Sequence, residues 1–153
     1  MRVILDCDPG IDDTYAIIFL TAAAHAGLIE LDCVTTTSGN VPADQCAQNA
    51  GWILGLCGLP IIPLAAGLPA PLEVELTTTP ETHGDTGLGY ANAPARHVEH
   101  DWDTLWIDSI ERGTDDLTRV TLMSDGASVY DCTTNDEVID LLQGGQGVFG
   151  IAI

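Results

Sequence analysis

The chain of 153 residues is long enough for one domain with a buried core, and its composition, 46 % hydrophobic and 18 % charged, is that of a globular protein. Its charge is extreme: 23 acidic residues stand against four basic ones, all arginine, for a net charge of −19. Such a surface repels nucleic acid and anionic membranes, so we expect neither as a partner. The complete lack of lysine resembles halophilic proteins, in which high salt screens the self-repulsion.

The N-terminus and the cysteines indicate the compartment. The chain opens directly on a strand-like segment, residues 2–7, without a basic n-region or a cleavage signal, and no apolar run could span a bilayer. Five cysteines make an odd number with no C-x-x-C pair, so we expect reduced thiols, with Cys7, Cys33 and Cys57 buried. We therefore expect a cytoplasmic protein without a disulfide framework or a zinc site.

Short β-rich runs alternate with helical patterns along the chain. The first helix carries acidic residues in its first turn and ends at Gly27, and the second opens at Pro42 and closes at Gly58. Residues 67–99 form a long stretch without a clear period. The alternation predicts a doubly wound, mostly parallel open sheet with flanking helices, a Rossmann-like α/β fold. The predicted strands are residues 3–7, 29–37, 60–67, 120–123 and 147–153, and the predicted helices are residues 12–27, 42–58, 102–113 and 135–145.

Four carboxylates crowd the end of the first predicted strand. The segment "LDCDPGIDD", residues 5–13, contains Asp6, Asp8, Asp12 and Asp13. Ligands of open α/β sheets bind at the carboxyl ends of the strands, and a hard divalent cation with oxygen ligands would neutralise this cluster. In a purely structural interpretation, the first pair lies in a solvated turn and the second pair caps the helix. Four carboxylates are harder to explain in that way than one or two.

Two other chemistries begin with closely spaced aspartates. An EF-hand loop counted from Asp6 would need glycine sixth and glutamate twelfth, whereas Gly10 is fifth and Ile17 is twelfth, which excludes it. An aspartyl-phosphate phosphohydrolase also begins with D-x-D after a strand, but its transferred phosphoryl group needs a nearby cation, usually lysine. This chain has no lysine, so a phosphohydrolase is the less favoured alternative.

The acidic segment and three further segments resemble a known family. "DCDPGIDDTYAI" resembles the signature of the inosine-uridine-preferring nucleoside hydrolases, and the other segments follow it in the order and spacing of that family. Together they cover most of residues 1–90. These further segments are "VTTTSGN" (residues 34–40), "QNAGWILGLCGLPIIPLAAGLPAPL" (48–72) and "HGDTGLG" (83–89).

The resemblance implies an activity and a set of site residues. Members hydrolyse the N-glycosidic bond of ribonucleosides to ribose and free base, using water activated by Ca²⁺. By correspondence, Asp8 and Asp13 are expected to bind the metal, and Asp8 also to take the proton from the water. Asp12 and Asn40 are expected to bind the ribose, and His83 to lie near the sugar and the base.

The resemblance is partial toward the C-terminus. Where members carry L-G-P-L-T-N, with a threonine main-chain carbonyl on calcium, this chain has "VTLMSDGASVYD", which places Val129 at the carbonyl donor. Family members are roughly twice as long, so residues 1–153 are expected to form one domain that corresponds to their N-terminal half, without the C-terminal half. An uncovered sheet edge would favour a homo-oligomer. A truncated, non-catalytic remnant that binds metal or sugar weakly is the alternative to an active enzyme.

Overall fold

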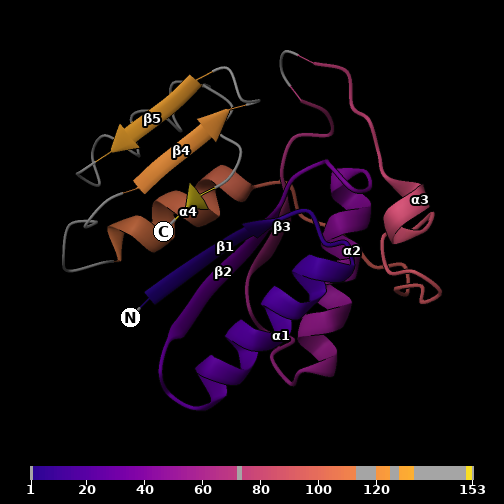
Figure 1. The fold of residues 1–153 in the computed structure, drawn as a ribbon. Coiled ribbons are helices and arrows are strands. Elements are labelled where there is room, and N and C mark those ends of the chain that lie inside the picture. Colours follow the sequence, from indigo (N-terminus) through magenta and orange to yellow (C-terminus); the bar gives the residue numbers. More distant parts are fainter. Residues whose placement is uncertain (1, 72–73, 113–119, 125–127, 133–150, 153) are drawn as a thin grey trace.

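The computed structural model describes residues 2–71, 74–112, 120–124, 128–132 and 151–152. Figure 1 shows the elements in chain order, and the strands and helices of the first half alternate as the sequence predicts. They are β1 (Arg2–Cys7), α1 (Ile11–His25), β2 (Glu30–Thr36), α2 (Ala43–Leu56), β3 (Leu64–Ala66), α3 (Pro80–His83), α4 (Trp102–Glu111), β4 (Val120–Ser124), β5 (Ser128–Cys132) and β6 (Ile151–Ala152).

The first helix begins and ends where local chemistry dictates. Asp12 and Asp13 lie in the first turn of α1, where the positive end of the helix dipole favours carboxylates. At the other end Gly27 takes a φ of 70°, and the Leu28 N–H donates to the Ala23 carbonyl at 3.0 Å. This left-handed glycine stops the helix and satisfies one of its free carbonyls.

The third strand is shorter than predicted. Only Leu64–Ala66 pairs with β2, whereas the pattern predicted a strand over residues 60–67. Pro60 and Pro63 cannot donate a backbone hydrogen bond, so the ladder starts after them, although the Pro63 carbonyl still accepts from the Val34 N–H at 2.9 Å.

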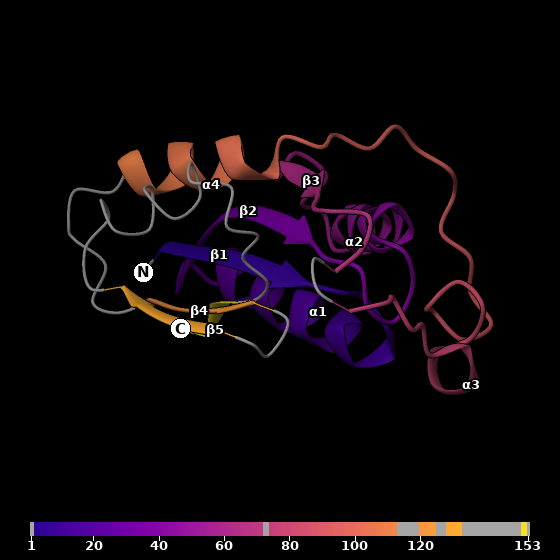
Figure 2. The ribbon, with the colours of Figure 1, turned by 90° about the horizontal axis from the view of Figure 1, so that it is seen from above.

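Three parallel strands in the order β1-β2-β3 form the central sheet. In the register, Cys7 pairs with Thr36 and Thr36 pairs with Ala66, so all three strands finish at one edge. Figure 2 shows α4 along one face of this sheet and α1 along the other. The chain is therefore an α/β protein with a parallel sheet between helices, as predicted. The main core lies between the sheet, α1 and α2, and consists of Val3, Cys7, Ile17, Leu31, Val34, Ala50, Ile53 and Leu54.

The later strands form a separate antiparallel sheet, in the order β5-β4-β6. The prediction that the strands near residues 120–123 and 147–153 join the parallel sheet is therefore wrong for β4 and β6. Only three residues connect β4 to β5, too few for the crossover that parallel neighbours need, so these two strands pair as an antiparallel hairpin. The predicted helix at residues 135–145 lies outside the described residues.

The predicted long segment over residues 67–99 contains a single short helix, α3, among its described residues. Cys7, Cys33 and Cys46 are buried free thiols. Cys57, which was expected to be buried, is only half-buried. Within the described residues, no helix combines the length and the apolar character needed to cross a bilayer.

A buried carboxylate joins β1, β2 and α4 at the amino end of the sheet. The Asp32 side chain is 1 % exposed, and its Oδ2 accepts from the Arg2 guanidinium and the Ser109 hydroxyl. The Arg2 guanidinium also donates to the Ser109 carbonyl at 2.6 Å, and Arg112 approaches Asp32 at 3.4 Å. This cluster fixes α4 on its face of the sheet.

We predict that Asp32→Ala lowers the free energy of unfolding by about 2–4 kcal/mol, because removing one partner leaves a partly buried guanidinium without its counter-charge. Urea denaturation measures the effect without changing ionic strength. Glu30→Ala removes an exposed carboxylate from the same strand and serves as the control, with an expected change under about 0.5 kcal/mol. Equal losses in the two variants would show that the Asp32 cluster has no special role.

Candidate active site

The carboxyl ends of β1 and β2 bring two motif segments together. Because Cys7 and Thr36 are paired in the parallel register, the residues that follow each strand lie side by side. The Asn40 backbone N–H donates to Asp8 Oδ2 at 2.8 Å, and its side-chain Nδ2 donates to the Asp8 carbonyl at 3.0 Å. A Cβ on Gly39 would collide with the Asp8 carboxylate, so only glycine allows this approach.

Asp8 and Asp13 form a close acidic pair. The Asp8 backbone N–H donates to Asp13 Oδ2 at 2.9 Å, which folds the start of α1 back onto the end of β1. Partial burial and the neighbouring carboxylates of Asp8 and Asp12 raise the pKa of Asp13 from 3.8 to about 6, against the opposing effect of the Asp8 N–H. The pair therefore attracts either a proton or a cation.

The turn between the pair packs against His83. The Ile11 N–H donates to His83 Nδ1 at 3.0 Å, so the neutral imidazole carries its proton on Nε2. Asp12 Oδ1 lies 3.9 Å from the same Nδ1 atom, whose lone pair the Ile11 N–H already occupies. A Cβ on Gly10 would lie 2.5 Å from His83 Nδ1 and 2.8 Å from Asn40 Nδ2. Since Gly10 has an extended backbone, with φ −91°, close packing rather than a tight turn requires glycine there.

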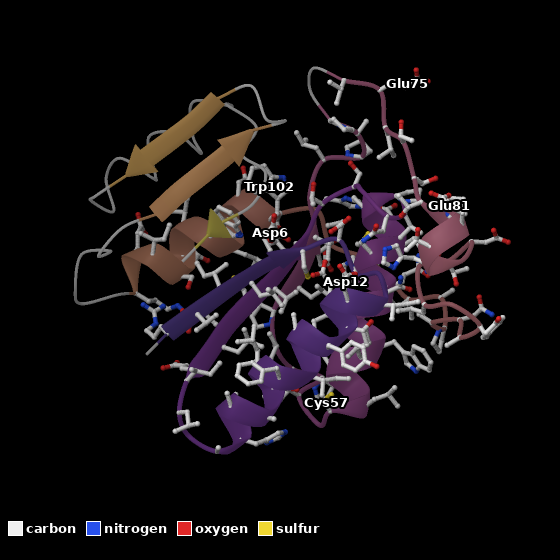
Figure 3. The ribbon with its side chains drawn as sticks, viewed as in Figure 1. Asp6, Asp12, Cys57, Glu75, Glu81 and Trp102 are labelled. Atoms are coloured by element: carbon white, nitrogen blue, oxygen red, sulfur yellow. The ribbon has the colours of Figure 1, made fainter. Side chains whose placement is uncertain are left out.

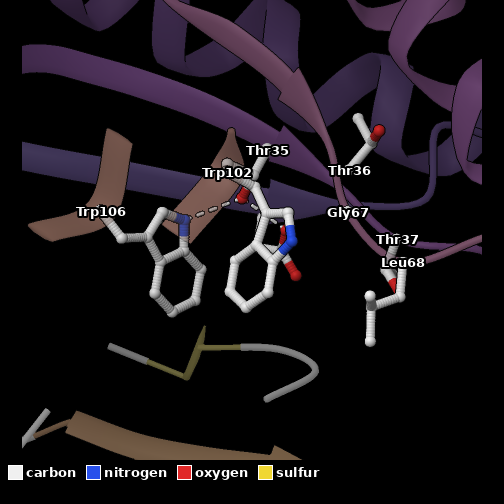
Figure 4. Close-up of a pocket in the computed structure, with 8 residues that line it drawn as sticks. Thr35, Thr36, Thr37, Gly67, Leu68, Trp102 and Trp106 are labelled. Carbon is white, nitrogen blue, oxygen red and sulfur yellow. Dashed lines mark hydrogen bonds between the residues drawn. The ribbon is translucent and has the colours of Figure 1, made fainter. Parts of the chain in front are cut away.

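The four aspartates of the motif do not converge on one point. Asp6 accepts from the Thr35 hydroxyl at 2.6 Å, and this hydroxyl in turn accepts from Trp106 Nε1 at 2.9 Å. Figure 4 shows the contact between Trp106 and Thr35 in a pocket that Asp6 also lines, and Figure 3 labels Asp6 and Asp12 at separate places along β1 and α1. The Asp12 side chain is 75 % exposed. The site is thus a pair, Asp8 and Asp13, with Asp12 at its rim.

Val129 lies in a different setting from the predicted one. It belongs to β5 and pairs with Met123 in the antiparallel sheet, whereas the resemblance places it at the position of a carbonyl that binds calcium in family members. The strand forms because β4 and β5 are joined closely enough to make a hairpin. A role for the Val129 carbonyl as a metal ligand stays a prediction.

The donor set fits part of a calcium site. Among the residues that the structure describes, no group of three or more histidine, cysteine or acidic side chains could hold a metal ion. Asp8 and Asp13 nevertheless provide hard carboxylate oxygens, half-buried and mutually repelling, which is the chemistry that Ca²⁺ prefers. Since Ca²⁺ takes about six to eight oxygens, the pair can supply only a fraction of them.

Two residues that the sequence prediction missed support the site. The Thr79 hydroxyl donates to Asn40 Oδ1 at 2.8 Å, and the Thr79 carbonyl accepts the His83 N–H at 3.0 Å. Asn49, which is fully buried on α2, donates to the Pro9 carbonyl at 3.1 Å. An asparagine among the apolar positions of a predicted helix was the available signal for Asn49, because a buried amide needs partners. Nothing in the local pattern around Thr79 indicated its role.

A parallel sheet with paired carboxylates at the end of its first strand defines an α/β protein with a ligand site at the carboxyl edge of the sheet. The family model described as inosine-uridine preferring nucleoside hydrolase matches residues 3–128. The chain belongs to this family.

Relatives and a solved structure agree with the family assignment. Over 94 residues the chain is 42 % identical to an inosine-uridine preferring nucleoside hydrolase of Leishmania major, a match that covers 61 % of this chain and 29 % of that protein. Over 87 residues it is 46 % identical to a pyrimidine-specific ribonucleoside hydrolase of Shewanella baltica, covering 57 % and 26 %. A solved plant nucleoside hydrolase aligns with a TM-score of 0.62 and 30 % identity, over 72 % of this chain and 35 % of that one. The chain thus spans about a third or less of each.

The raised pKa of Asp13 gives a pH-dependent contribution to stability without metal. Because the folded-state pKa lies above the ordinary 3.8, the protonated side chain stabilises the fold, and this contribution disappears as the pH rises through about 6. We predict that the free energy of unfolding of the wild type falls relative to that of Asp13→Asn by on the order of 1 kcal/mol from pH 5 to pH 7.5, after allowing for the partial exposure of Asp13. Urea unfolding in a chelator measures it, and a difference that is constant with pH would contradict the pairing.

Proposed function

We propose that this chain carries the metal-binding and ribose-binding part of a nucleoside hydrolase, which cleaves the N-glycosidic bond of ribonucleosides to ribose and free base. The observation that carries the proposal is the Asp8–Asp13 pair, held at the carboxyl edge of the sheet with the pKa of Asp13 raised to about 6. Two carboxylates kept this close, in a segment that matches the family, favour a bound cation as their neutraliser.

Asp8 and Asp13, with the Val129 carbonyl, are the residues proposed to hold Ca²⁺. A bound Ca²⁺ would neutralise the two carboxylates and lower the pKa of a neighbouring water. Asp8 is the proposed general base, and the Asn40 N–H fixes the carboxylate oxygen Oδ2 in place for that role. The Asp12 carboxylate, which lies outside the pair, would add negative charge that stabilises the oxocarbenium-like ribosyl group as the bond breaks.

The substrate would lie on the exposed side of the pair. Asp12, at the rim, has an exposed carboxylate that can accept hydrogen bonds from ribose hydroxyls. Asn40 already uses both ends of its amide within the protein, so its proposed contribution is the second hydrogen of Nδ2 together with the placement of Asp8. His83 offers its Nε2–H, because Nδ1 accepts from Ile11.

The alternative is a non-catalytic chain that binds metal or sugar weakly. It is favoured by the donor set, because the pair of carboxylates that the described residues bring to the site supplies fewer oxygens than Ca²⁺ needs. The phosphohydrolase alternative has no comparable support. A single domain over residues 1–153, a cytoplasmic and halophilic setting, and a homo-oligomer stay predictions.

A calcium titration tests whether the proposed metal site exists. We predict that Ca²⁺ binds in a chelator-stripped sample and that at pH 5.5 each ion displaces about three quarters of a proton, since Asp13 with a pKa of about 6 must ionise. Almost no proton is released at pH 8. Isothermal titration in buffers of different ionisation enthalpy measures both quantities.

The matched variants for calcium binding are Asp8→Asn and Asp85→Asn. The first removes one ligand charge and is expected to weaken binding by roughly 10- to 100-fold. The second removes an exposed carboxylate from the nearby loop and should leave affinity unchanged. Equal affinities in both variants would place the ion elsewhere.

Ribose release from inosine and from uridine tests the reaction itself, in high salt with and without Ca²⁺. We expect release that depends on Ca²⁺ and falls at least about 100-fold in Asp8→Asn, because the proposed base and ligand is lost. Calcium binding without ribose release would support the non-catalytic alternative. Phosphate release from a phosphoester with Mg²⁺ would instead favour the phosphohydrolase.

A further inference from the structure

Asn49 is a buried polar residue that connects several parts of the site. Its side chain is inaccessible to solvent, and Nδ2 donates to the Pro9 carbonyl at 3.1 Å and to the Thr86 carbonyl at 2.7 Å. Its Oδ1 accepts from Gln45 Nε2 at 3.0 Å. Two carbonyl partners require the nitrogen on that side, so the orientation of the amide is fixed by its surroundings.

The two carbonyls belong to two different pieces of the site. Pro9 lies in the turn between Asp8 and Asp13, and Thr86 lies in the His83–Gly89 loop. The loop approaches the turn closely at Gly87, where a Cβ would lie 2.9 Å from the Pro9 carbonyl and 3.0 Å from Asn49 Nδ2. Asn49 therefore fills the junction where α2, the turn and the loop meet.

The loop is closed on itself by backbone hydrogen bonds. Gly84, Gly87 and Gly89 all have positive φ angles, and the Gly87 N–H donates to the Gly84 carbonyl at 3.1 Å. The Gly89 N–H closes the loop by donating to the His83 carbonyl at 2.7 Å. A constraint applied at Thr86 is thus transmitted to His83, three residues earlier in the same closed loop.

We propose that Asn49 is a positioning residue: its amide clamps the His83–Gly89 loop to the Pro9 turn and so holds the His83 imidazole against the Ile11 N–H, beside the acidic pair. This inference rests on the proposed function, since the role of His83 beside the substrate comes from it. Asn49 itself is buried and acts only through His83 and the turn. No other described side chain hydrogen-bonds both segments through one group.

The test compares Asn49→Leu, which replaces the amide with an apolar group of similar size, with Gln45→Ala, which removes only the donor to Oδ1. Amide hydrogen exchange by NMR follows two groups: the Ile11 N–H, bonded to His83, and the Val34 N–H, bonded to Pro63 within the sheet. We expect the Ile11 amide to exchange about tenfold faster or more in Asn49→Leu only, with the Val34 amide unchanged. With uridine or inosine, kcat should fall about 10- to 100-fold while the affinity for Ca²⁺ is kept.

Each outcome decides the proposal. Unchanged Ile11 exchange in Asn49→Leu, or equal loosening of Ile11 and Val34, overturns it, because the amide would then have no role or only a general structural one. If Asn49→Leu does not fold, Gly87→Ala disturbs the same junction from the loop, because its Cβ would lie 2.9 Å from the Pro9 carbonyl, and it is judged by the same two amides. If the wild type releases no ribose, the proposed function fails, while the exchange data still decide whether Asn49 clamps the loop.

Discussion

Asp8 and Asp13 are held together by the backbone, since the Asp8 N–H binds the Asp13 carboxylate, while partial burial and the neighbouring Asp8 carboxylate raise the pKa of Asp13. The fold relieves this repulsion only in part, through the Asn40 N–H on Asp8 and the helix dipole at the start of α1. The remaining negative potential is concentrated at the carboxyl edge of the sheet. This is the edge at which we propose that a cation binds.

The neighbouring segments keep this pair in place by close backbone approach and by buried amides. Gly10 and Gly39 leave room where any Cβ would strike a site side chain. Asn40 joins Asp8 to Thr79, and Asn49 joins the turn to the His83–Gly89 loop. The long segment between β3 and α4 is thus fixed at the site by polar contacts, in addition to the packing of Leu88 against the main core.

Acidic residues have different roles on the α4 face of the sheet and at its carboxyl edge. Asp32 and Asp6 lie toward α4 and accept from arginine, serine and threonine groups, so their charge or their oxygens hold that helix and its tryptophans in place. Asp8 and Asp13 have no arginine or lysine partner among the described ion pairs. This difference in partners, rather than the number of carboxylates, separates the structural aspartates from the candidate metal ligands.

The sequence by itself determined the α/β class, the order of the first strands and helices, and the family, because hydrophobic period, helix stops and the acidic motif are local patterns. Three features depended on contacts between distant segments. Asp6 turns to Thr35, leaving a pair where four carboxylates were expected, and Asn49 and Thr79 bind segments about 40 residues away. The antiparallel pairing of β4 with β6 also went against the predicted parallel sheet. Hydrogen-bond partners and strand neighbours are set by which segments meet in space, and a local pattern does not record that.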